Sequence, residues 1–145
     1  MIQRIQSIFL LICSASFFSL FGVPFATSTE SLPLLFSDMV YNIQDSPILS
    51  ILCILGGTVS LIAIFLYNKR DVQLKLSYLT TVAAILLPLT AILLVYNEGT
   101  GDAGLAKIND QLGIYLPIIG FVFSLLASKY IKKDESTVRS MDRLR

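Results

Sequence analysis

Four long runs without a charged residue limit what this chain can fold into. They cover residues 5–24, 48–67, 76–96 and 112–128. Each is close to the ~20 residues that a helix needs to cross ~30 Å of hydrocarbon. A soluble domain would not separate its charges so completely, and 54% hydrophobic with 14% charged residues is far from the globular average. The sequence therefore predicts an all-α membrane protein, an antiparallel four-helix transmembrane bundle.

Two parts follow from these runs. Residues 1–130 are predicted to form the bundle, with spans at about 5–25, 48–67, 76–96 and 112–130. Residues 131–145 are predicted to form a charged tail outside the membrane.

The basic residues indicate how the chain lies in the membrane. With four spans, the N-terminal segment, the second connection and the C-terminal segment share one side. These three segments hold ten of the eleven Lys and Arg residues, whereas the other two connections hold six acids and one base, Lys107. Because basic residues accumulate on the cytoplasmic side, both termini are predicted to be cytoplasmic.

The N-terminus also permits a second interpretation, since Arg4 followed by an apolar run is similar to a secretory signal. The run continues to Phe25, which is too long for such a signal, and cleavage after Ala26 would put Pro24 where a small residue is needed. Retention of the segment is therefore favoured. Cleavage would leave three spans and an external N-terminus.

The two external connections are predicted to differ. In residues 26–47, four apolar side chains share a helical face, and residues 39–43 alone also fit a short strand. Either way the segment is expected to pack on the bundle or lie in the interface. The four that share the helical face are Leu32, Phe36, Met39 and Ile43. Residues 97–111 contain three glycines and are predicted to be flexible.

Small residues and prolines inside the runs indicate packing. Gly56 and Ser60 lie four residues apart, a spacing that lets helix backbones approach closely, either within the chain or between two copies. Pro88 and Pro117 are predicted to kink their helices. Cys13 and Cys53 lie at different depths of antiparallel helices, so they are interpreted as small packing residues.

The sequence lacks the residues that several kinds of catalytic, transport and metal sites ordinarily need. The chain has no His, and no run contains an ionisable Asp, Glu, Lys or Arg, which proton relays and coupled transporters ordinarily need. The external acids match no calcium loop and are interpreted as solvated; they are Glu30, Asp38, Asp45, Glu98, Asp102 and Asp110. We therefore expect no catalytic residue, no metal, no cofactor and no nucleic-acid partner.

The last seventeen residues carry six of the eleven basic side chains. Lys129, Lys132 and Lys133 come first and are expected to meet anionic headgroups, worth ~1 kcal/mol each near the surface. From Asp134 onward a helix would form an ion pair between Glu135 and Arg139, and such pairs are too weak to hold a short helix alone. The tail would need a surface, so membrane anchoring and docking of a protein partner both remain open, beside an inert solvated tail.

Three segments of the chain resemble a known family. They are the opening Met-Ile-Gln-Arg-Ile-Gln, the turn at residues 68–70 with Gln73 after it, and the ending from Lys133 to Arg145. Together they are similar to a domain-of-unknown-function family of small four-span inner-membrane proteins of the Bacteroidota. The resemblance implies a bacterial cytoplasmic membrane and the same four-span layout, and it brings no activity.

These observations favour a non-enzymatic accessory or scaffolding subunit. Its cytoplasmic rim would dock a membrane or cytosolic protein, or anionic lipid, and a second copy of the chain is another candidate partner. The alternative is a small oligomeric channel or facilitator that uses the Gly56 face and the two prolines. The predicted docking residues are Arg4, Lys69, Arg70, Lys132, Lys133, Arg139, Asp142, Arg143 and Arg145.

Overall fold

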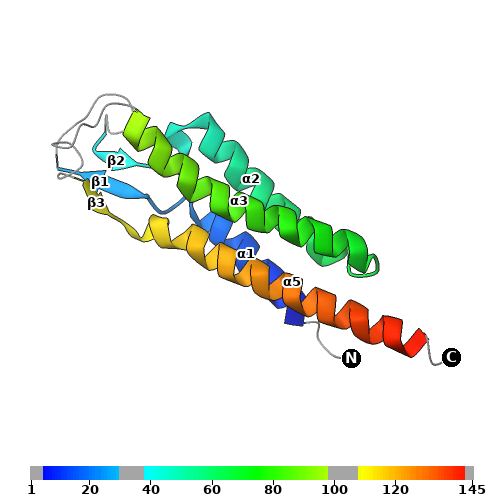
Figure 1. Ribbon diagram of the computed structural model, residues 1–145. Helices are drawn as coiled ribbons and strands as arrows, with labels where there is room; N and C mark the ends of the chain where they lie inside the picture. The colour runs from blue at the N-terminus through cyan, green and yellow to red at the C-terminus, as the bar shows by residue number, and fades with distance from the viewer. Residues whose placement is uncertain (1–4, 30–37, 98–107, 143–145) are drawn as a thin grey trace.

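The computed structural model describes residues 5–29, 38–97 and 108–142. Most of them belong to four helices, α1 (Ile5–Ser19), α2 (Pro47–Phe65), α3 (Arg70–Asn97) and α5 (Tyr115–Asp142). Helices that follow one another run in opposite directions along a common long axis (Figure 1). Helices α1 and α3 each contact both α2 and α5.

Three of the helices are long and apolar enough to cross a membrane: α2, α3 and α5. Their outward faces are apolar, as the exposure of Ile51, Phe65, Ile85 and Leu93 illustrates. A continuous apolar surface of this kind would promote aggregation in water and is stable in lipid. The chain is therefore a helical membrane protein, as its sequence predicts.

Helix α1 is shorter, with 15 residues, and ends before the predicted span does. Residues 20–22 form a turn, and Pro24 follows. Proline provides no amide hydrogen and disfavours helical geometry in the residue before it, which favours an end of the helix in this segment. The side chains of Leu20 and Phe25 nevertheless remain buried in the apolar core.

A small antiparallel sheet, which the sequence pattern does not predict, covers one end of the helices (Figure 1). Its central strand β1 (Ala26–Ser28) pairs with β2 (Val40–Tyr41) on one side and β3 (Ile108–Asp110) on the other. The strand interpretation of the first external connection is thus confirmed for residues 40–41, and Tyr41 and Ile43 are packed in the core. Leu32, Phe36 and the three glycines at 99–104 lie outside the described residues.

Close packing of α1 against α2 depends on glycine. A Cβ at Gly56 would lie 2.6 Å from the Phe17 ring, and one at Gly57 would lie 2.9 Å from the Phe18 ring. Ser60 donates a hydrogen bond to the Leu10 carbonyl across the same interface, at 2.8 Å. The small residues therefore pack within the chain, which is one of the two roles that their spacing predicts.

The two cysteines pack among the helices, and the two prolines lie at different places in their helices. Cys13 and Cys53 are free and fully buried, and their thiols donate to the carbonyls of Gly120 and Phe17. Pro88 lies inside α3. Pro117 is the third residue of α5 and lies in its first turn, where an amide has no acceptor within the helix. It therefore does not interrupt the helix.

Candidate functional site

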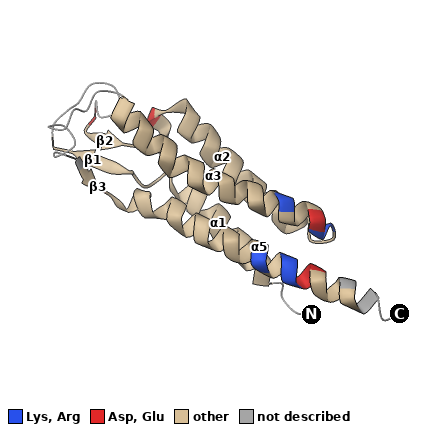
Figure 2. Ribbon diagram, in the orientation of Figure 1, with Lys and Arg blue, Asp and Glu red and all other residues tan. Residues whose placement is uncertain are grey.

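The described Lys and Arg side chains gather at the end of the helices opposite the sheet (Figure 2). We call this region the charged end. Its basic members come from the start of α3, the turn before it and the last part of α5. They are Lys69, Arg70, Lys75, Lys129, Lys132 and Lys133, interspersed with Asp71, Asp134 and Glu135. The first described residue, Ile5 of α1, and the last, Asp142 of α5, both lie toward this same end (Figure 1).

An ion pair joins two parts of the charged end. The Nε of Arg70 lies 3.2 Å from Oδ2 of Asp134, which ties the first residue of α3 to α5. The Arg70 side chain is 25% exposed and that of Asp134 is 43% exposed. Arg70, one of the predicted docking residues, therefore has a partner within the chain, and Asp134 is a site residue that was not predicted.

Beneath the charges lies a buried pair of amides. Gln6 of α1 is 3% exposed and Gln73 of α3 is completely buried, and Nε2 of Gln6 donates to Oε1 of Gln73 at 3.4 Å. Nε2 of Gln73 has no hydrogen-bond partner among the described residues. The opening of the chain and the segment after the α2–α3 turn, which carry the family resemblance, thus meet in space.

Four hydroxyl side chains fasten α3 to α5 next to the amide pair. Oγ of Ser77 lies 2.8 Å from Oγ of Ser128, and Thr81 donates to Oγ of Ser124 at 2.9 Å. All four side chains are buried. Since hydrogen bonds between helices hold membrane proteins together where the hydrophobic effect does not, this cluster fixes the direction in which α5 leaves the other helices.

Helix α5 continues past the other helices as a projecting segment, residues 134–142, which we call the α5 extension (Figure 1). The helix that the sequence allows from Asp134 onward is present as far as Asp142, as a continuation of α5. Ile131 is the last fully buried side chain, and the described side chains from Ser136 onward are exposed. At 1.5 Å per residue, Asp142 lies about 16 Å along the helix from Ile131.

The remaining predicted docking residues divide into three groups. Lys69, Lys132 and Lys133 are exposed at the charged end. Arg139 and Asp142 lie on the α5 extension. Arg4, Arg143 and Arg145 are outside the described residues.

At the charged end, charged side chains lie above neutral polar ones. Its side chains are Lys, Arg, Asp and Glu at the helix ends, with neutral amides and hydroxyls below. The buried hydroxyls of Ser77, Thr81 and Ser128 bond to helix carbonyls or to one another. Such groups stabilise the contacts between helices.

Comparison with known proteins places the chain in a family without assigning a function. No curated protein and no solved structure matches it. A family model matches residues 2–144, nearly the whole chain, and its description is "Domain of unknown function (DUF4293)". The chain therefore belongs to the DUF4293 family.

Proposed function

We propose that α1, α2, α3 and α5 form an antiparallel four-helix bundle in the cytoplasmic membrane of a bacterium, with both termini in the cytoplasm. The charge asymmetry supports this orientation, since the described Lys and Arg side chains lie at one end and the sheet at the other (Figure 2). The short helix α1 fits the proposal because Leu20 and Phe25 extend its apolar path beyond Ser19 to the sheet.

Within this arrangement the protein is a non-enzymatic accessory or scaffolding subunit, and the α5 extension is its docking element for another protein. The observation that carries this function is the continuation of α5 as one helix beyond its neighbours (Figure 1). A tail that anchors to lipid would turn into the plane of the membrane, where an amphipathic helix can bury one face. The α5 extension instead keeps the direction of the helices that cross the bilayer.

The lysines at the base of the extension have a different role. Lys129, Lys132 and Lys133 are exposed close to the last buried turn of α5, at the level expected for headgroups. Contacts with anionic lipid there would hold the helix at a fixed depth, at ~1 kcal/mol per basic residue. The distal segment is then presented in water, where a partner can reach it.

A pull-down in mild detergent tests the proposal. The intact chain is compared with a chain that ends at Lys133 and with a full-length variant in which Lys129, Lys132 and Lys133 are replaced by Gln. A docking element predicts a specific protein that is lost on truncation and retained by the lysine variant. Identical sets of co-purifying proteins from all three chains would count against it.

The alternative of an oligomeric channel has weaker support. The Gly56 and Gly57 positions that two copies would share are occupied by the rings of Phe17 and Phe18 of the same chain. The inward-facing Ser60 and Ser77 donate to helix carbonyls, which leaves them poorly suited to line a pore. Ion or solute flux into liposomes containing the purified protein would favour the channel over the docking subunit.

A further inference from the structure

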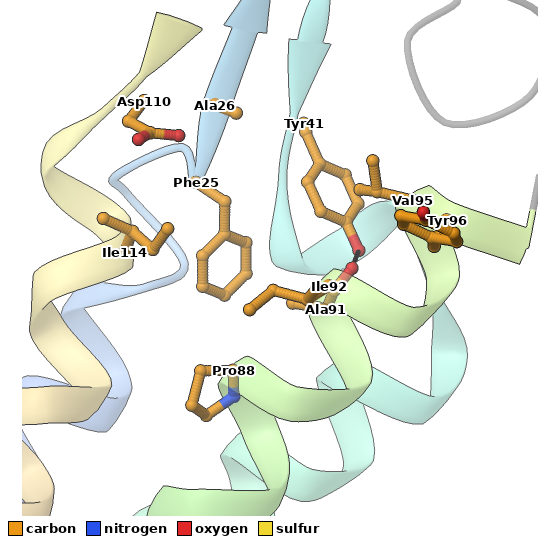
Figure 3. A pocket seen from close by; sticks show the side chains of 10 residues that line it. All are labelled: Phe25, Ala26, Tyr41, Pro88, Ala91, Ile92, Val95, Tyr96, Asp110 and Ile114. Carbon is orange, nitrogen blue, oxygen red and sulfur yellow. Dashed lines mark hydrogen bonds between the residues drawn. The ribbon is translucent and has the colours of Figure 1, made fainter. Parts of the chain in front are cut away.

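A cavity of about 340 Å³ lies at the sheet end, between the second half of α3, the sheet and the turn that leads into α5 (Figure 3). Its volume is at the lower end of the range for ligand pockets, which suits one acyl chain better than a whole two-chain lipid. Ile92 and Tyr96 line its outer side and are 58% and 70% exposed, so the cavity reaches the surface of α3.

The inner wall of the cavity is apolar and held in place. Phe25 and Tyr41 are almost completely buried, and their ring centroids lie 5.7 Å apart. The Tyr41 hydroxyl donates to the Ala91 carbonyl at 3.3 Å, which fixes the ring against α3 (Figure 3). Pro88 closes the end of the cavity that lies farther from the sheet (Figure 3).

A single carboxylate lines the opposite end. Asp110 belongs to β3, and Figure 3 shows its side chain beside β1, at the far end of the cavity from Pro88. The carboxylate is exposed and has no hydrogen-bond or ion-pair partner among the described residues. The cavity therefore offers an apolar wall for a hydrocarbon chain and, next to the sheet, one negative charge to which the described residues provide no partner.

We propose that this cavity binds a phospholipid with a primary ammonium headgroup, of the phosphatidylethanolamine type. One acyl chain lies between Ile92 and the inner wall, and the ammonium group meets Asp110. Charge complementarity selects this headgroup, since an anionic lipid such as phosphatidylglycerol would place its phosphate and hydroxyls beside the same carboxylate without a compensating cation. The assignment requires only that α3 lies in the bilayer, and it does not depend on a partner at the charged end.

Tryptophan fluorescence in vesicles tests the proposal, because the natural chain contains no Trp. Tyr96→Trp puts a reporter on the cavity, and the matched control Tyr78→Trp puts one on the same helix near the charged end. Vesicles contain mixtures of plain phospholipid with phosphatidylethanolamine or phosphatidylglycerol whose acyl chains are brominated, which quenches Trp on contact. Ile114→Trp is a second cavity reporter if Tyr96→Trp does not fold.

The expected result is a preference for the ethanolamine lipid at the cavity reporter, about fivefold or less for a solvent-accessible ion pair. No such preference is expected at Tyr78→Trp, because the lysines of the charged end favour the anionic lipid instead. Adding Asp110→Asn to the Tyr96→Trp chain should remove the preference, since the change keeps the shape and removes the charge. Coincident quenching curves at the cavity reporter would overturn the proposal. So would a preference that survives Asp110→Asn.

Discussion

Nε2 of Gln6 lies 3.4 Å from Oε1 of Gln73, although 67 residues separate them in the chain. This bond connects the first turn of α1 to the first turn of α3, two helices that each pack mainly against α2 and α5. The second amide hydrogen-bonding group of Gln73 is buried without a partner among the described residues. One hydrogen-bonding group of Gln73 is therefore satisfied and the other is not. The pair lies close to Arg70, the first residue of α3, which forms the ion pair with α5.

Replacing one member of this pair should cost more than replacing both. Gln6→Leu leaves the amide of Gln73 buried without its bond, for which we expect a loss of about 1–2 kcal/mol. The double variant Gln6→Leu with Gln73→Leu removes both polar groups and should recover most of that loss. Thermal unfolding of the four chains in detergent measures the cycle. A double variant that is less stable than either single one would contradict a purely structural role.

Gly113 is expected to tolerate no side chain. A Cβ there would collide with the carbonyl group of Pro24, which is backbone and cannot rotate away. Because the Gly113 amide also donates to that carbonyl, at 3.1 Å, Gly113→Ala should separate the start of α5 from the sheet. We expect a destabilisation of about 1–3 kcal/mol in detergent. Gly22→Ala is the matched control, since its nearest neighbour, the Ser19 carbonyl, lies 3.8 Å away, and an equal effect of both changes would refute the explanation.

The ion pair between Arg70 and Asp134 should contribute little to stability. Both side chains are partly exposed, so we expect a coupling of about 0.2–1 kcal/mol that decreases at high salt. Arg70→Asp and Asp134→Arg should each lower the unfolding temperature slightly, and the double exchange should restore it. A coupling well above this range and insensitive to salt would contradict the partial exposure of the two side chains.

Cysteine labelling tests the proposed orientation. The native Cys13 and Cys53 are fully buried, so they should not react with a membrane-impermeant maleimide. In sealed spheroplasts Asn109→Cys at the sheet end should be labelled, and Ser136→Cys on the α5 extension should be labelled only after lysis. The opposite pattern would reverse the orientation. Labelling of both positions before lysis would exclude four crossings.

The long elements of the fold could be predicted from sequence because their signals are long. Four charge-free runs predict helices through the simple requirement that hydrocarbon excludes charge, and Gly56 with Ser60 indicates a close helix contact. The sheet could not be predicted in this way. The three-residue strand Ala26–Ser28 is too short for an alternating pattern, and its pairing depends on a partner far along the chain, as Ala26 with Asp110 shows.

The sequence predicts at which end of the helices the charged side chains gather, but not which of them contact one another. Charge distribution alone brings Lys69, Arg70 and Lys132 to one end. Which acid pairs with Arg70 depends on the rotation of α5 about its axis, which packing with the serines and threonines of α3 determines. The burial of Gln73 could not be predicted either, because a glutamine near a turn is ordinarily exposed.

The measurement that tests the central claim most directly is photocrosslinking in the native membrane. A photoreactive amino acid is placed at Ser136 or Ser140, both exposed on the α5 extension, and at Leu125, which is exposed on the apolar part of the same helix. Docking through the extension predicts one discrete protein adduct from positions 136 and 140 and none from position 125. Adducts with lipid alone at positions 136 and 140, or the same protein adduct at all three, would contradict it.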